Sequence, residues 1–356
     1  MFDLRAVPET DPVDVYRVRD GIYAADMLLT ALVHLDLFTW LAEHPSTLEE
    51  ICRAFGTTPR PTDVMLTLLA AMGLVEEKQH VHQQHVPQQD VPQQHVYHLS
   101  TTAREHLVKT SPWFLGPYYD SLKNRPVALD LLNVLRTGKP ANWSSKKDGQ
   151  DWHKAMESEE FAAQFTAAMD CRGVYLAQAV AKSLDLSRRR RVLDIAGGSG
   201  IYACSLVTHH PNVLATVFEK PPVDRIAAGA IANRGCSDRV AVVAGDMLVD
   251  RLPGDADVHL WSNVLHDWDQ PVVRQLIAKS FDALPPDGLV VIHDAFLNGS
   301  KDGPLHVAEY SVLLMHSSEG RCYSTREMQQ YLADAGFRDV LYRDTAAARG
   351  IMTATK

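Results

Sequence analysis

The nine residues "SNVLHDWDQ", Ser262 to Gln270, place a histidine and two acids directly after an apolar run. The imidazole of His266 changes charge near neutral pH, so it can act as a general base, and it can equally ligate a metal ion. Asp267 can hold that imidazole or ligate the same metal. A third interpretation is a core histidine that bonds to a neighbour.

A second group of residues has the spacing of a nucleoside site. In "VLDIAGGSG", Val192 to Gly200, an apolar run leads into a glycine-rich turn, which lets the backbone approach a ligand closely. Glu219 ends the next apolar run, where a carboxylate can bind two ribose hydroxyls. Asp246 ends the third, where it can accept from an adenine amino group. The pattern is not G-x-G-x-x-G, so a ligand without phosphates is favoured. The predicted cofactor-binding residues are Asp194, Gly197, Gly198, Gly200, Glu219, Asp246 and Met247.

These side chains need a sheet whose strands end at a common edge. From Arg191 onward, short apolar runs alternate with helical stretches, a pattern typical of βα repeats that build a parallel sheet. The predicted fold class is therefore α/β, with a Rossmann-like sheet in a catalytic domain over residues 186–356. Residues 105–185 carry helical, aromatic-rich segments and are predicted to be a helical linker or substrate cap.

Residues 1–104 have the pattern of a winged helix. Ser46 and Glu49 predict a capping box that opens one helix, a second helix follows, and two strands form the wing. Arg60 is the one basic residue at the start of the presumptive recognition helix, so a dimerisation role is favoured over DNA binding. The repeat "QQHVPQQDVPQQHVY", residues 83–97, is predicted to be an exposed low-complexity insert in the wing.

Composition narrows the class of partner. A net charge of -9 disfavours nucleic acid, which is bound through clustered Lys and Arg. The five cysteines include no C-x-x-C pair, which fits a reducing cytoplasm rather than a disulfide framework. The helix predicted over residues 20–43 is apolar around most of its circumference, so it is buried, within the chain or against a second subunit. Its run "MLLTALVHLDLFTWL" is too short to span a bilayer, so no membrane partner is expected.

The segments "LDIAGGSG", "GDM", "LHDW" and the closing "GRCYS" with "LADAGF" together resemble a known family. The chain is similar to class I S-adenosylmethionine-dependent methyltransferases, and more narrowly to the plant-caffeate and bacterial-antibiotic O-methyltransferases. The resemblance covers nearly the whole chain. It implies S-adenosyl-L-methionine as cofactor, a small-molecule substrate of secondary metabolism and a homodimer formed through the N-terminal domain. Ala196 stands where the family usually has glycine, and Glu219 stands where it usually has Asp.

In that family the histidine matching His266 takes a proton from a phenol or enol, and two glutamates hold the imidazole. Here Asp294 stands at the first glutamate position and Cys322 at the second, with an additional histidine, His316, six residues earlier. Two histidines and one carboxylate are the ligands of a facial triad, suited to iron and accepted by zinc or nickel. His266, Asp294 and His316 are therefore predicted to bind a divalent or ferric metal.

Three functions follow from these residues. The leading prediction is metal-assisted C-methylation of the β-carbon of a 2-oxo acid, with the metal stabilising the enolate. It resembles the phenylpyruvate-type C-methyltransferases of peptide-antibiotic pathways. The alternative is metal-free O-methylation of a phenol or enol hydroxyl, with His266 as general base and Asp294 orienting it. The choice between Asp267 and Asp294 as the carboxylate partner stays open. A third hypothesis is a winged-helix regulator that senses the cofactor.

Overall fold

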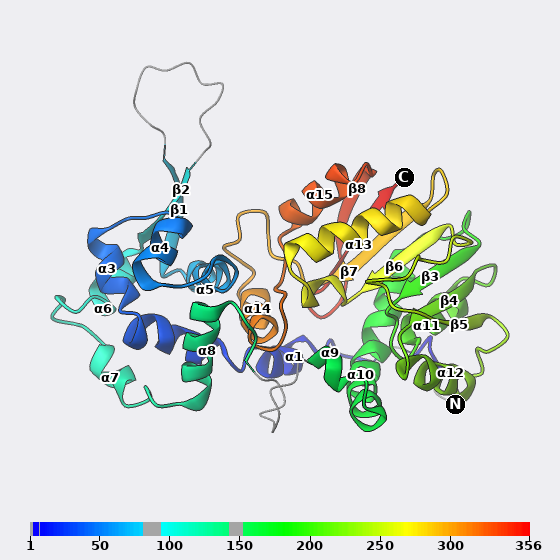
Figure 1. Cartoon of the computed structure of the whole chain (residues 1–356), viewed down its shortest axis with the longest axis horizontal. Helices are drawn as coiled ribbons and strands as arrows, with labels where there is room; N and C mark the ends of the chain where they lie inside the picture. Colours follow the sequence, from blue (N-terminus) through cyan, green and yellow to red (C-terminus); the bar gives the residue numbers. More distant parts are fainter. Residues whose placement is uncertain (1–2, 7, 81–93, 142–151) are drawn as a thin grey trace, which may run out of the picture. The chain divides into compact units, whose positions relative to one another are not determined.

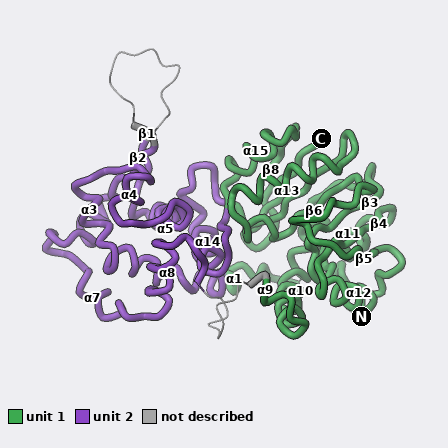
Figure 2. Tube along the Cα trace, viewed as in Figure 1, with its two compact units in different colours: residues 1–16, 144–296, 323–356 green, residues 17–143, 297–322 purple. Residues whose placement is uncertain are grey.

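The computed structural model describes residues 3–6, 8–80, 94–141 and 152–356. The chain divides into two compact units that are not contiguous in sequence (Figure 2). Unit 1 contains residues 1–16, 144–296 and 323–356, and unit 2 contains residues 17–143 and 297–322. Helix α1 (Val13–Asp20) runs across the first boundary.

Unit 1 is built on a seven-stranded sheet in the order β5-β4-β3-β6-β7-β9-β8 (Figure 1). Strands β3 to β7 are parallel, and β9 runs antiparallel to its neighbours β7 and β8. The predicted Rossmann-like sheet is confirmed. The strand order reverses at β3, which has β4 on one side and β6 on the other, and ligands of such sheets bind outside the carboxyl ends at this point. The strands are β3 (Arg191–Ile195), β4 (Leu214–Glu219), β5 (Val240–Ala244), β6 (Val258–Ser262), β7 (Leu289–Asp294), β8 (Arg338–Asp344) and β9 (Gly350–Thr355).

Helices cover both faces of this sheet (Figure 1). One core cluster joins the sheet to α10, α11 and α12, and the other joins it to α13 and α15. Because both faces are buried, the central strands are apolar at successive positions, and this made them recognisable in the sequence. The helices of unit 1 are α9 (Trp152–Ala155), α10 (Glu159–Ser183), α11 (Ile201–His209), α12 (Val223–Asn233), η2 (Leu265–Asp267), α13 (Gln270–Ala283) and α15 (Thr325–Asp334).

Unit 2 is mainly helical, and α14 packs there against α5, α2 and α8. The prediction of one helix over residues 20–43 is wrong, because Asp20 ends α1 and the helical stretches Ala24–His34 and Leu37–Glu43 are separate. The last of them begins after Asp36, which adopts φ +53, a left-handed conformation that ends a right-handed helix. The elements of unit 2 are α2 (Ala24–Leu29), η1 (Thr30–His34), α3 (Leu37–Glu43), α4 (Leu48–Phe55), α5 (Pro59–Ala71), β1 (Val75–His80), β2 (Gln94–Leu99), α6 (Thr101–His106), α7 (Gly116–Asp120), α8 (Pro126–Thr137) and α14 (Leu305–Ser317).

The capping box that opens α4 lies one residue later than predicted. Thr47 is the N-cap, and its hydroxyl accepts from the backbone N–H of Glu50, whose carboxylate accepts from the Thr47 N–H. Ser46 cannot take this role because its backbone pairs with Tyr97 through N–H···O contacts of 3.3 and 2.8 Å.

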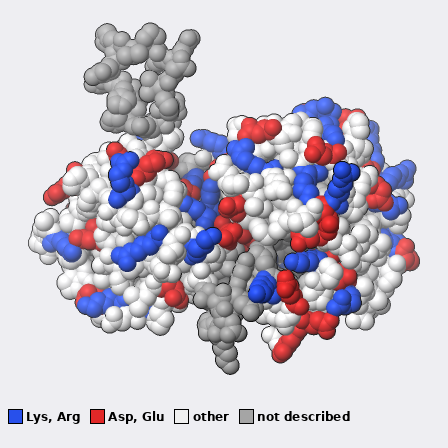
Figure 3. Space-filling model, in the orientation of Figure 1, with Lys and Arg blue, Asp and Glu red and all other residues white. Residues whose placement is uncertain are grey.

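Helices α4 and α5 and the β1–β2 hairpin occur in the order predicted for a winged helix. The hairpin is antiparallel, with Val75 opposite Leu99. Residues 94–97 of the repeat belong to β2, whereas the rest of the predicted insert lies outside the described residues. Acidic and basic side chains are interspersed on the visible face of both units (Figure 3).

Among the described helices, no single one has the length and apolar composition to cross a membrane. The helical stretches Ala24–His34 and Leu37–Glu43 meet that criterion when taken jointly, with a 60° bend between them.

Candidate active site

The glycine-rich turn after β3 is shaped by the buried carboxylate of Asp194. Asp194 is 0% exposed, and its Oδ2 accepts from the backbone N–H of Ala203 in α11 at 3.2 Å. A Cβ on Gly197 would lie 2.6 Å from the Asp194 carboxyl carbon, so glycine is required for this close approach. Burial raises the pKa of Asp194 to about 7. The Asp194 carboxylate therefore supports the glycine-rich turn from its buried side.

The turn also contacts the end of β4. The backbone N–H of Gly198 donates to Glu219 Oε2 at 2.9 Å, so the turn and this carboxylate lie together. A Cβ on Gly198 would meet nothing within 4 Å, so that side of the turn is open to a ligand. Burial raises the pKa of Glu219 to about 7, although the N–H groups of Gly198 and Lys220 lower it. Gly200, with φ +72, caps α11.

Asp246 follows β5, on the far side of β4 from the turn. Its Oδ1 accepts from the Leu248 N–H at 2.8 Å, and its Oδ2 lies 3.6 Å from the Lys220 ammonium. Met247 is half-buried, and its carbonyl accepts from Lys279 Nζ at 2.5 Å. The acids Asp194, Glu219 and Asp246 therefore lie at or just beyond the carboxyl ends of three adjacent strands.

Gly197→Ala is expected to destabilise the fold by about 1–3 kcal/mol, because the new methyl group overpacks Asp194. Weaker binding of S-adenosylhomocysteine should accompany the loss, since the turn must shift. Gly229→Ala in α12 is the matched control, because its Cβ meets nothing within 4 Å. Thermal unfolding and calorimetric titration measure both effects, and equal Tm values for the two variants would contradict the argument.

His266 lies in η2, just beyond the carboxyl end of β6, and it is buried. Its Nδ1 lies 2.5 Å from Asp294 Oδ1 at the end of β7, and that oxygen also accepts from the Ala295 N–H. Asp267 Oδ1 is 3.9 Å from His266 Nε2. Because β6 and β7 are neighbouring parallel strands, residues at their carboxyl ends meet at one edge of the sheet. Asp294, rather than Asp267, is thus the hydrogen-bonded carboxylate partner.

Charges around His266 favour its protonated form. Burial lowers the pKa of His266, but Asp294 and Asp267 together outweigh burial and raise it above its ordinary value. Burial would raise the pKa of Asp294, but the His266 charge and hydrogen bond lower it. Burial raises the pKa of Asp267 to about 6. A histidine held by one ionised carboxylate can accept a proton and keep the resulting charge.

His316 belongs to unit 2, whereas His266 and Asp294 belong to unit 1. At the end of α14, the centroid of the His316 ring lies 4.5 Å from that of Tyr23 with the rings tilted by 46°, and its Nε2 lies 3.8 Å from Asp130 Oδ2. Within either unit, no three described His, Cys, Asp or Glu side chains form a group that could hold a metal ion. The predicted metal triad therefore has no support from the ligand geometry.

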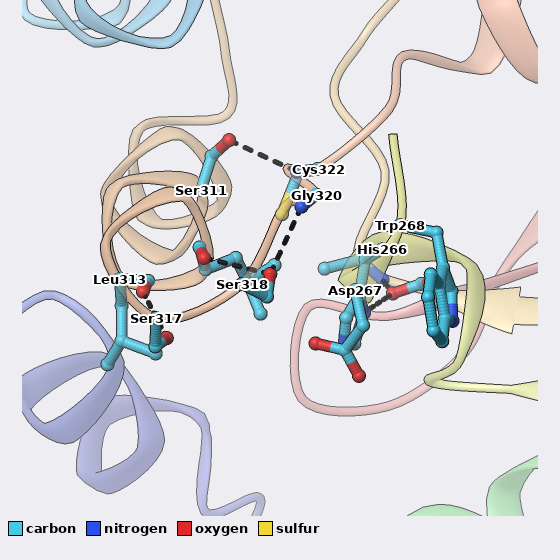
Figure 4. A network of polar contacts seen from close by, with 12 residues as sticks. His266, Asp267, Trp268, Ser311, Leu313, Ser317, Ser318, Gly320 and Cys322 are labelled. Carbon is cyan, nitrogen blue, oxygen red and sulfur yellow. Dashed lines mark hydrogen bonds and ion pairs between the residues drawn. The ribbon is translucent and has the colours of Figure 1, made fainter. Parts of the chain in front are cut away.

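Figure 4 shows the polar contacts of residues 266–268, which follow β6, and of residues 311–322, from α14 onward. In unit 1 the Trp268 carbonyl accepts from the Tyr323 hydroxyl at 2.7 Å, which holds the end of η2. In unit 2 the Cys322 N–H donates to Ser311 Oγ at 3.1 Å, and the Gly320 N–H donates to Ser318 Oγ at 3.2 Å. Cys322 is fully buried, so the residue at the family's second glutamate position is a core thiol.

Sequence reasoning missed several polar residues near His266. The guanidinium charge of Arg172, in α10, lowers the pKa of both His266 and Asp267, and the long helix that carries it has no distinguishing motif. Asn263 and His293, beside the ends of β6 and β7, hydrogen-bond with neighbouring side chains. The sequence shows their positions, but not the partners that the sheet brings to them.

Comparison with known proteins identifies the family of the chain. The family model described as the O-methyltransferase domain matches residues 129–338, and that of the O-methyltransferase dimerisation domain matches residues 19–109. A 3-hydroxy-5-methyl-1-naphthoate 3-O-methyltransferase from Streptomyces sahachiroi is 30% identical, with 88% of this chain and 86% of that protein covered. An L-tyrosine C(3)-methyltransferase from Streptomyces lavendulae is 26% identical, with coverages of 94% and 90%.

Among solved structures, an O-methyltransferase family 2 protein from Planctomyces limnophilus, in complex with apigenin, superposes with a TM-score of 0.85. It is 32% identical, and the match covers 100% of this chain and 99% of that one. The family models together cover most of the helical N-terminal region and the five parallel strands β3 to β7 of the sheet. The chain therefore belongs to the O-methyltransferase family, as an S-adenosylmethionine-dependent transferase with an N-terminal dimerisation domain.

Proposed function

We propose that this enzyme methylates a phenolic or enolic hydroxyl of a small aromatic molecule of secondary metabolism, with His266 as general base and no catalytic metal. The observation that carries the proposal is the 2.5 Å contact between His266 Nδ1 and Asp294 Oδ1 at the carboxyl end of the sheet. Because Nδ1–H donates to the carboxylate, Nε2 is the nitrogen with the lone pair in neutral imidazole. That nitrogen can accept the hydroxyl proton.

The bound cofactor supplies a methyl group on a sulfonium, which is already activated for in-line displacement. His266 removes the proton from the acceptor hydroxyl as the oxygen attacks, and Asp294 stabilises the imidazolium that forms. The raised pKa of His266 brings it closer to that of a phenol, which lies near 10, and so eases the proton transfer. Burial of the pair keeps competing water away from the base.

The residues at the ends of β3, β4 and β5 fit the cofactor. Glu219 would bind the two ribose hydroxyls and Asp246 the adenine amino group, with Met247 beside the ring. The open side of Gly198 would admit the ligand, and Asp194, Gly197 and Gly200 would maintain the turn. Since β4 and β5 lie on one side of β3 and β6 on the other, the proposed cofactor residues and His266 flank the carboxyl end of β3 on opposite sides.

Metal-assisted C-methylation of a 2-oxo acid, the leading prediction from sequence, is not supported as well as O-methylation. The family match and the His266–Asp294 pair both favour the alternative. The relatives named for a hydroxynaphthoate and bound to apigenin suggest a fused-ring phenol as substrate class. The dimerisation domain supports a homodimer in which the N-terminal region, with its winged-helix order of elements, makes the subunit contact.

The test is product analysis with the purified enzyme, methyl-labelled S-adenosylmethionine, and apigenin or a hydroxynaphthoate as acceptor. We expect an aryl methyl ether by NMR, formed at an unchanged rate after treatment with a strong chelator. Methylation of 2-oxo acids that requires added metal would overturn the proposal in favour of the first prediction. A methyl group on ring carbon would place the enzyme with its tyrosine C-methylating relative, because a phenolate is nucleophilic at both positions.

A further inference from the structure

The turn between β6 and η2 carries the base, and it is held in an unusual backbone conformation. Ser262 ends β6, and Asn263 follows it with φ +54. Few residues other than glycine adopt this left-handed conformation, although asparagine does so more readily than most. Such a conformation persists where surrounding contacts determine it. The contacts around Asn263 are therefore informative.

Two links tie this turn to β7. The backbone N–H of Asn263 donates to the carbonyl of His293 at 2.8 Å. Ser262 Oγ lies 2.9 Å from His293 Nδ1. The Asn263 side chain adds to this network, because its Nδ2 lies 3.3 Å from Ser262 Oγ and 3.0 Å from the Tyr202 hydroxyl. One residue of β7 thus holds the turn through both its backbone and its ring.

His293 is buried in a neutral form. Its side chain is 0% exposed, and burial lowers its pKa to about 3. Nδ1 can therefore accept the Ser262 hydroxyl proton, which leaves the ring proton on Nε2. That atom has no hydrogen-bond partner among the described residues, which opposes stability. A phenyl ring would pack here without such an unsatisfied group, so the link to Ser262 distinguishes histidine from a packing residue.

We propose that His293 is a positioning residue, whose neutral ring anchors the Ser262–Asn263 turn to β7 and thereby fixes His266 against Asp294. Successive residues of a strand point to opposite faces, so β7 orients the base through Asp294 and anchors its turn through His293. The inference rests on the proposed function, since it requires His266 to be the base. A small displacement of a catalytic group is enough to reduce turnover strongly.

His293→Phe tests this proposal, because it keeps a ring and removes the acceptor nitrogen. We expect kcat to fall by about tenfold or more, with KM for the phenol and Kd for S-adenosylhomocysteine unchanged within about threefold. The acid limb of the kcat–pH profile should move to lower pH. Asp294 and Asp267 raise the pKa of His266, and Arg172 lowers it. A loosened turn weakens the contact with Asp294 and so lowers the pKa of His266.

Ser262→Ala removes the same contact by deleting the Ser262 hydroxyl instead of the His293 ring nitrogen. If His293→Phe does not fold, Ser262→Ala alone tests whether His293 positions the turn. The kcat of the double variant Ser262→Ala/His293→Phe should be no lower than that of the more impaired single variant. Both substitutions remove the contact between Ser262 Oγ and His293 Nδ1. His293→Asn, whose amide oxygen can accept from Ser262, should restore the wild-type limb. If the acid limb of the kcat–pH profile were unshifted in both His293→Phe and Ser262→Ala, His293 would be a core packing residue and not a positioning residue. Undiminished activity of His266→Asn would instead overturn the proposed function.

Discussion

His266→Ala is expected to lower kcat by about 10²–10⁴-fold, the usual contribution of a positioned general base. The affinity for S-adenosylhomocysteine should stay the same within about threefold, because the predicted cofactor contacts lie on β3, β4 and β5 rather than on η2. Steady-state kinetics and calorimetric titration provide the two measurements. In the wild-type enzyme, activity should rise with pH as His266 loses its proton, with the midpoint above the ordinary histidine pKa.

His266→Asn is the matched control, since its amide can still donate to Asp294 but cannot accept a proton at neutral pH. It should be as impaired as the alanine variant. Asp294→Asn should instead retain a base but move the acid limb to lower pH, because the carboxylate that raises the pKa of His266 is removed. A His266→Asn enzyme with nearly full turnover would show that His266 orients the substrate and is not the base.

Glu219→Ala is expected to weaken S-adenosylhomocysteine binding by about 10²-fold or more, because two ribose hydroxyls lose a charged acceptor. The substitution also removes the acceptor of the Gly198 N–H, so the turn loses its tie to β4. Cofactor affinity of the wild-type enzyme should fall as the pH is lowered through about 7, where the buried carboxyl takes up its proton.

Two further substitutions of Glu219 separate the loss of the ribose contact from the loss of the Gly198 contact. Glu219→Asp keeps the carboxylate that the family usually has, and it should bind within about tenfold of wild type. Glu219→Gln should bind weakly at every pH and lose the pH dependence. If Glu219→Gln bound S-adenosylhomocysteine as tightly as wild type at pH 8, the ribose assignment would have to be abandoned.

The sheet was predictable because its central strands are buried on both faces and therefore read as apolar runs. The carboxyl ends of those strands could be located for the same reason, so Glu219, Asp246 and His266 were assigned to one edge. Their roles in binding and catalysis stay predictions. The capping box was predicted at Ser46, one residue too early, because the backbone pairing of Ser46 with Tyr97 cannot be read from the sequence.

Other features depend on contacts that sequence order hides. The predicted helix over residues 20–43 breaks at Asp36, a residue that an unbroken helix would also accept. His316 was grouped with His266 and Asp294 from the family resemblance, and the sequence does not show that α14 packs with α5, α2 and α8 in unit 2. His293 could not be singled out from the sequence, because its contact with Ser262 depends on how β6 and β7 lie together in the sheet.

The packing of α14 in unit 2 has a consequence for synthesis on the ribosome. Residues 17–143 emerge before the sheet of unit 1, but they complete their unit only when residues 297–322 follow, after strands β3 to β7 have been made. Until then the surface of α5 that α14 covers stays exposed to solvent and to other chains. Unit 2 therefore cannot finish folding before residues 297–322 are made, and the growing chain carries an exposed apolar surface on α5 while the strands β3 to β7 are synthesised.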